Sequence, residues 1–175
     1  MPSGKVHDRI TIAAAGLSVP VWLACSPTPR DLSAGATLIV SLLFSGLALS
    51  PDLDLDSSVY RRWGPFRWIW WPYQKLVRHR SWISHSFLIA PLLRIAYFLF
   101  VVWGIFRIAS FVVDLLVAPF DRNAWSERAF EALVALPRTH PHHFQMLLLG
   151  LFLGAALHSG ADLLVSAFKR KRRRR

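Results

Sequence analysis

The sequence has one cysteine, Cys25, among its 175 residues, which excludes a framework of disulfide bonds. Charged residues are also scarce, at 18% of the chain against about 25% in an ordinary soluble domain. No Gly-x-Ser-x-Gly elbow, P-loop or Cys-x-x-Cys pair occurs, so serine hydrolase, NTPase and thiol redox chemistry have no support. No internal repeat of a recognisable period is present either.

Apolar residues are abundant instead, at 54% of the chain. A helix needs about 20 apolar residues to cross about 30 Å of hydrocarbon. Stretches 87–106 and 144–168 are long enough, whereas 10–25 and 34–49 have only 16 residues each and are marginal. Residues 108–119 are apolar but contain Asp114, which favours an interfacial or amphipathic helix. We therefore predict an all-α integral membrane bundle of about four transmembrane helices.

The distribution of basic residues predicts the orientation. If all four stretches cross, one side collects 15 Lys and Arg and the other collects 5. Cytoplasmic segments carry the excess of Lys and Arg, so both termini and the loop 50–86 are expected in the cytoplasm, at the plasma (inner) membrane. Residues 1–168 then form a single membrane-embedded domain, followed by a basic cytoplasmic tail over 169–175.

The net charge of +11 points to an anionic partner. Because the basic clusters flank apolar runs, the bilayer and its anionic lipid headgroups are the expected partners of the basic loop and tail, and nucleic acid is disfavoured. Six aromatic residues in segment 63–73 favour the same interpretation, since Trp and Tyr prefer the headgroup level.

Histidines and aspartates gather at the cytoplasmic ends of these stretches. His7 and Asp8 precede the first, Asp52, Asp54 and Asp56 follow the second, His79 and His85 precede the third, and His158 and Asp162 lie in the fourth. Four separate segments thus bring ligand-type side chains to one membrane face, as in metal sites between the helices of a bundle. The alternatives are private hydrogen bonds between helices and a surface turn with unpaired carboxylates.

Spacing adds detail to this prediction. His158 and Asp162 are four residues apart, so they share one helix face. Asp52, Asp54 and Asp56 lie on one side of the chain if it is extended there. Gly150, Gly154 and Gly160 are predicted to permit close helix packing.

Imidazole and carboxylate donors together suit Zn²⁺ first, with Mn²⁺ or Fe²⁺ as alternatives. The number of donors exceeds one zinc site, so one or two divalent ions are expected. On the opposite side of the membrane lie His140, His142 and His143, in a loop or at the start of the fourth stretch. They are a further, accessory metal-binding possibility.

The pattern resembles the YdjM/YbcI-like predicted membrane-bound metal-dependent hydrolases. The matching elements are an early His, a Pro-Asp-x-Asp, a His-Arg with a following His-Ser, and a late His-x-x-x-Asp, which read here as His7, 51–54, 79–86 and 158–162. This chain departs from that family in having Leu55 where His commonly follows the second Asp, and in lacking Thr-Pro after Asp162.

We therefore predict a metal-dependent hydrolase that uses metal-activated water on a phosphoester or a similar polar bond. Arg80 is expected to steady an anionic substrate, and Asp56 to act as a ligand or general base. The alternative is a non-catalytic protein whose ions hold the helices together. The predicted metal ligands are His7, Asp52, Asp54, His79, His85, His158 and Asp162.

Overall fold

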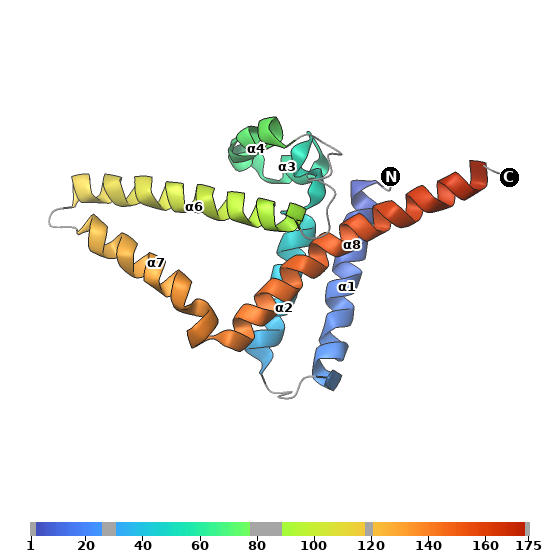
Figure 1. Ribbon diagram of the computed structural model, residues 1–175, viewed down its shortest axis with the longest axis horizontal. Helices are drawn as coiled ribbons and strands as arrows, with labels where there is room; N and C mark the ends of the chain where they lie inside the picture. Colours follow the sequence, from blue (N-terminus) through green and yellow to red (C-terminus); the bar gives the residue numbers. More distant parts are fainter. Residues whose placement is uncertain (1–2, 26–30, 78–88, 118–120, 174–175) are drawn as a thin grey trace.

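A computed structural model describes residues 3–25, 31–77, 89–117 and 121–173. These ranges are helical and contain no strand, which confirms the predicted all-α class. Figure 1 shows α1, α2 and α8 side by side as a bundle, while α6 and α7 extend from it as an arm. In chain order the elements are α1 (Gly4–Cys25), α2 (Leu32–Leu47), η1 (Pro51–Asp54), α3 (Ser58–Arg62), η2 (Gly64–Trp70), α4 (Trp71–Leu76), α6 (Ile89–Leu116), α7 (Arg122–Thr139) and α8 (Pro141–Arg173).

Four helical segments are long and apolar enough to cross a membrane. They contain the predicted stretches 10–25, 34–49 and 144–168, and residues 89–106 of the third stretch, whose first two residues lie outside the described ranges. The first two segments are longer than the 16-residue apolar stretches found in the sequence. α1 has 22 residues because it begins at Gly4, and the second segment runs for 23 residues from α2 through η1. At 1.5 Å per residue, α1 is about 33 Å long, which is enough for the hydrocarbon core.

The arm differs most from the prediction. α6 runs without a break from Ile89 to Leu116, so residues 108–116 continue the third apolar helix and do not form the separate helix that was predicted over 108–119. Asp114 falls in the last turn of α6, where an ionisable side chain does not interrupt a helix and can reach the polar interface. A further helix, α7, follows, and the carboxylate of Asp121 caps its start by accepting from the Asn123 and Ala124 amides.

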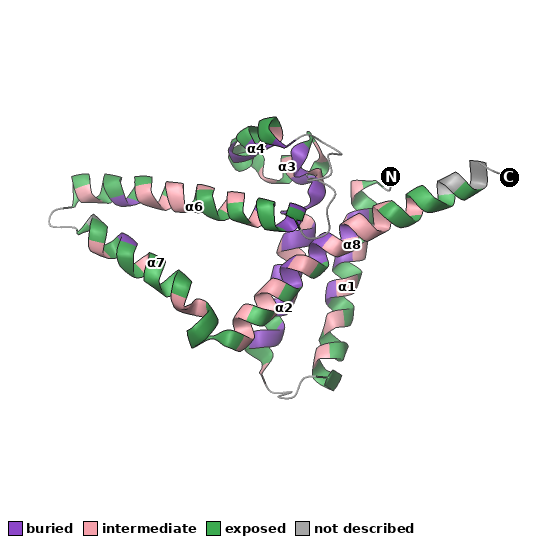
Figure 2. Ribbon diagram, in the orientation of Figure 1, coloured by how far each residue is buried: buried purple, intermediate pink, exposed green. Residues whose placement is uncertain are grey.

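Small residues bring α2 and α8 into close contact. A Cβ atom added to Gly154 would lie 2.6 Å from the Leu42 carbonyl oxygen and 2.8 Å from the Gly46 nitrogen, and one at Gly150 would meet Ser41. The close packing predicted for these two glycines is confirmed, whereas Gly160 has open space around it and was wrongly included. Figure 2 shows the resulting buried surface on α2 and the part of α8 beside it.

Residues 51–77, which we call the cap, fold over the end of α2. Buried Trp70 and Tyr73 form its core together with Tyr97 and Phe98 from the start of α6. Their aromatic rings pack edge-on, tilted or stacked, with centroids 5.3–6.2 Å apart. Part of the aromatic segment predicted as an interfacial anchor therefore forms a core, while Phe66, Trp68 and Trp71 remain exposed.

α8 extends beyond the predicted apolar stretch 144–168 at both ends. It begins at Pro141, three residues before the predicted apolar stretch, and continues to Arg173. Proline suits the first turn of a helix because no intrahelical partner exists there for its missing N–H. The backbone of the basic tail is thus helical up to residue 173.

Candidate metal centre

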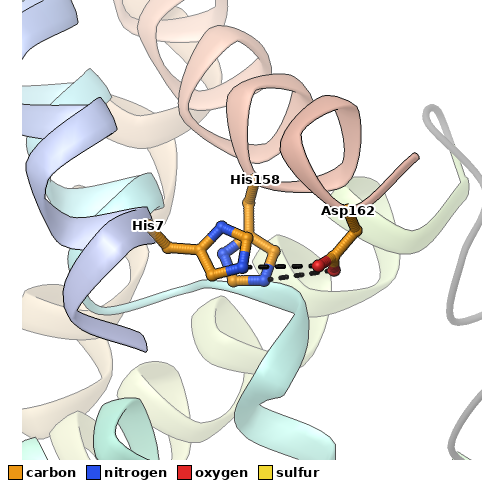
Figure 3. Close-up of side chains that lie close together, drawn as sticks. All are labelled: His7, His158 and Asp162. Carbon is orange, nitrogen blue, oxygen red and sulfur yellow. Dashed lines mark ion pairs between the residues drawn. The ribbon is translucent and has the colours of Figure 1, made fainter. Parts of the chain in front are cut away.

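Four side chains from three separate segments meet at the cap end of the bundle. We call His7 of α1, Asp52 of η1, and His158 and Asp162 of α8 the site cluster. The Nε2 atom of His7 lies 3.4 Å from Asp162 Oδ1, and Nε2 of His158 lies 3.5 Å from Asp52 Oδ2 and 3.8 Å from Asp162 Oδ2. Figure 3 shows both imidazoles directed toward the Asp162 carboxylate. Their rings are stacked, with centroids 3.7 Å apart.

The cluster is buried and its hydrogen-bonding capacity is incompletely used. His7 is 4% exposed and His158 is 2% exposed. Within the part of the chain that the structure describes, six buried side-chain polar atoms have no hydrogen-bond partner, and three of them belong to His7, His158 and Asp162. Nε2 of His158 and Oδ1 of Asp162 lie within the cluster, whereas the unsatisfied atom of His7 is Nδ1, not the Nε2 that faces Asp162. Because an unsatisfied buried polar group costs roughly 1–3 kcal/mol, the two atoms within the cluster require a ligand or another explanation.

Ser50 orients His158, and its role was not predicted from the sequence. Its hydroxyl oxygen lies 3.0 Å from His158 Nδ1 and also accepts from the Asp52 amide. If the imidazole proton is on Nδ1, it is donated to Ser50, and the lone pair of Nε2 points to the carboxylates. Metal-binding histidines commonly use their second nitrogen in this way. The sequence signal was the Ser-Pro-Asp that begins η1, since Ser is a preferred cap before a proline.

The three aspartates of segment 52–56 do not share one side. They were predicted to do so if extended, but Pro51–Asp54 is a 3₁₀ helix with three residues per turn, so Asp52 and Asp54 diverge. Asp52 faces His158, while Asp54 is buried near Tyr73 and Arg94. Burial raises the pKa of Tyr73 to about 12, with Asp54 acting in the same direction and Arg94 in the opposite one.

The remaining predicted residues fall elsewhere. Asp56, the predicted ligand or general base, has a side chain 71% exposed and lies 3.7 Å from the guanidinium of Arg61 rather than in the cluster. His79, Arg80 and His85 lie outside the described residues, so their roles stay predictions. The structure therefore brings together four of the seven predicted metal ligands and places Asp54 near Tyr73 and Arg94 instead.

Arg62 of α3 fixes the first turns of α1 relative to α2. Its guanidinium donates to Asp8 Oδ2 at 2.6 Å and to the Leu47 carbonyl at the end of α2 at 2.5 Å. The start of α1 also touches the cap, because a Cβ atom on Gly4 would collide with Ser58. His7, one residue before Asp8, is thereby held against α8.

The cluster fits a divalent transition-metal ion. With metal–ligand distances of about 2.0–2.2 Å, two donor atoms on a tetrahedral Zn²⁺ are about 3.3 Å apart. The observed separations of 3.4–3.8 Å are close to that value, and one donor atom each from His7, His158 and Asp162 lies within 4.8 Å of the others. Two carboxylates would balance the charge of a divalent cation, which matters in a buried site.

At the opposite end of the bundle, His142 and His143 lie in the first turn of α8, where they were predicted in a loop or at the start of the last stretch. His142 Nδ1 is 3.1 Å from Asp31 Oδ2, and His143 Nε2 is 2.9 Å from Ser33 Oγ. His140 caps the end of α7. In the described ranges, no three donor atoms converge at this end as they do in the site cluster.

Comparison with known families matches residues 2–172, nearly the whole chain, to the family described as "Uncharacterized metal-binding protein (DUF2227)". No curated protein and no solved structure matches the chain.

Proposed function

The chain belongs to the DUF2227 family of metal-binding proteins, and from that premise we propose that it binds a divalent transition-metal ion through His7, His158 and Asp162, with Asp52 as a further carboxylate ligand. The observation that supports this proposal is the convergence of donor atoms from α1, η1 and α8, in which Nε2 of His7 and Nε2 of His158 both lie 3.4–3.8 Å from carboxylate oxygens. A bound cation would use the lone pairs of these nitrogen and oxygen atoms.

The donor set favours Zn²⁺, with Mn²⁺ and Fe²⁺ as alternatives, since two imidazoles and one or two carboxylates suit these ions. The number of ions depends on His79 and His85, which were predicted as additional ligands. We further propose that the metal centre lies at the cytoplasmic face of the plasma (inner) membrane. This orientation rests on the excess of Lys and Arg on the side of the cap and both termini.

Hydrolysis of a phosphoester is the activity that we propose for the centre. A bound divalent cation would supply Lewis acidity toward phosphoryl oxygens. The protein would contribute Asp52, a carboxylate only partly buried at the edge of the cluster, and Arg80 as the predicted contact for an anionic substrate. The resemblance to predicted membrane-bound hydrolases supports the same reaction class.

The alternative is a metal that only holds helices together. This second function is favoured by one observation: the cluster joins α1, η1 and α8, which are far apart in the sequence. In that case the ion stabilises the fold by about 2.7 kcal/mol when its free concentration is a hundred times its Kd.

Metal content tests the proposed binding directly. Elemental mass spectrometry of the detergent-purified protein should find about one to two equivalents of Zn, Mn or Fe per chain. His158→Ala should lose this metal, while His142→Ala, an equivalent change at the opposite end of α8, should keep it. A chain without stoichiometric metal, prepared without chelators, would contradict the proposal, as would equal metal content in the two variants.

Two readouts on the metal-loaded protein then separate the hydrolase from the structural function. Hydrolysis of bis(p-nitrophenyl) phosphate that disappears in His158→Ala supports catalysis. Absence of hydrolysis toward phosphomonoesters and phosphodiesters, together with a Tm lowered by chelation, supports the structural function.

A further inference from the structure

An apolar groove lies between α1 and α8 beside the site cluster. Its volume is about 440 Å³, and its lining includes Val6 and Ile10 of α1 and Leu157, Gly160, Ala161 and Leu164 of α8. Both helices are long and apolar enough to span a membrane. The groove is therefore placed where hydrocarbon chains of lipids are available.

The groove and the cluster use neighbouring faces of the same two helices. Val6 directly precedes His7, and Leu157 and Ala161 directly precede His158 and Asp162. Since successive helical residues are about 100° apart, the apolar wall lies next to the ligand face on both helices. A molecule with an apolar chain in the groove would thus bring its polar end to the cluster.

Charge near this end of the bundle favours an anionic headgroup. Lys5 and Arg9 are exposed on either side of Val6, and exposed Lys171 follows the groove residues along α8. Each basic residue near a surface of anionic lipid contributes about 1 kcal/mol of attraction. Phosphate oxygens are also suitable ligands for a divalent cation.

We propose that the ligand of the metal centre is a membrane phospholipid, with an acyl chain in the α1–α8 groove and its phosphate at the metal. This proposal rests on the proposed metal binding and narrows the substrate class to a lipid phosphoester. The lipid is recognised by two features in combination, the apolar wall and the cation, so its occupancy of this groove depends on the metal.

A second groove provides an internal control. It lies between α2 and α8, has a volume of about 460 Å³, and is lined by residues that include Val40, Phe44 and Leu147. None of its lining residues belongs to the site cluster or directly precedes one of its members. Ordinary surrounding lipid should enter it whether or not metal is bound.

Photo-crosslinking tests the proposal in nanodiscs that contain phosphatidylglycerol with a diazirine on one acyl chain. The full-length protein is loaded with Zn²⁺ or stripped with EDTA, its metal content is measured, and labelled peptides are mapped by mass spectrometry. Zinc should increase labelling of the α1–α8 groove and leave labelling of the α2–α8 groove unchanged. Equal labelling of both grooves with and without zinc would overturn the proposal and indicate surrounding lipid only.

Gly160→Leu places a side chain in the groove that Gly160 lines, and nothing lies within 4 Å of its Cβ atom. It should reduce zinc-dependent labelling about fivefold to a hundredfold, the range expected for overfilling a packed space, and retain the metal. Gly104→Leu is the matched control, since Gly104 also has open space but lies on α6. Unchanged labelling in Gly160→Leu contradicts the lipid proposal alone, whereas a metal-free wild-type protein contradicts the proposed function as well.

Discussion

The two ends of the α1–α2–α8 bundle contain the same kinds of side chain in different states. At the cap end, the imidazoles of His7 and His158 are buried, and atoms of both lack hydrogen-bond partners in the described structure. At the opposite end, His142 and His143 are partly exposed, and each has a hydrogen-bonding partner, Asp31 and Ser33 respectively. Histidine and aspartate in proximity therefore do not by themselves identify a metal site.

The difference lies in burial and in the neighbouring donors. The Asp31 carboxylate accepts from the Ala34 amide at 3.0 Å and from the Ser33 hydroxyl at 2.7 Å. These hydrogen bonds to the charged form lower the pKa of Asp31 to about 2. The Asp31 carboxylate thus already has hydrogen-bond partners as the cap of α2. In the site cluster, by contrast, His158 Nε2 and Asp162 Oδ1 are buried without a hydrogen-bond partner, so their lone pairs are available to a cation.

The two ends of the bundle are held together by the contact between α2 and α8, and Gly154→Ala should disrupt this contact. Its added methyl group would meet the α2 backbone, so the free energy of unfolding should fall by about 1–3 kcal/mol, with weaker metal binding as a consequence. Thermal unfolding in detergent measures the change. Gly160→Ala, six residues along the same helix, should be neutral or stabilising, and equal losses in the two variants would show that the interface is not the cause.

Replacing Ser50 should weaken metal binding at the cap end without removing a metal ligand. Ser50→Ala deletes the partner of His158 Nδ1, and loss of such an orienting group typically lowers metal affinity about 10- to 100-fold. Competition with a chromophoric chelator measures the Kd. Ser33→Ala at the opposite end should leave the Kd unchanged, and an unchanged Kd in Ser50→Ala would mean that this hydroxyl does not orient the ligand.

Asp31→Asn should have the smallest effect, which is a change in thermal stability that arises at the end of the bundle opposite the cap. Asparagine still caps α2, so the substitution removes mainly the charge. Because the folded-state pKa of Asp31 is about 2, below its usual 3.8, the charge stabilises the fold above pH 3.8, and this contribution is lost as pH falls toward 2. The Tm of the variant should be slightly lower than that of the wild type at pH 5, and the difference should shrink as pH falls and vanish only below pH 2. A difference that is the same at pH 5 and at pH 2 would contradict this account.

Much of the bundle could be predicted from hydropathy and spacing. The four apolar stretches correspond to four long helices, and the spacing of His158 and Asp162 places them on one face of α8. The ends of the helices were harder to predict, because the start of α1 depends on contacts of Gly4 and Asp8 with the cap. These contacts join residues more than fifty positions apart.

The meeting of α1 with α8 could be predicted only coarsely. Topology placed His7 and His158 at the same membrane face, but their stacking depends on how closely the helices pack. The role of Ser50 and the buried position of Arg94 were missed for another reason. A serine before a proline and an arginine inside an apolar helix each have several ordinary explanations, and only the fold places Ser50 on His158 and buries Arg94 near Asp54.

The central claim is that His7 and His158, 151 positions apart, bind the same ion. X-ray absorption spectroscopy of the zinc-loaded protein tests it most directly, because imidazole nitrogens at about 2.0–2.1 Å give a recognisable multiple-scattering signal. The account predicts at least two imidazoles in the wild type and in His142→Gln, whereas His7→Gln and His158→Gln should lose stoichiometric zinc and show one imidazole fewer on any zinc that stays bound. An imidazole count that is the same in His7→Gln as in the wild type would contradict it.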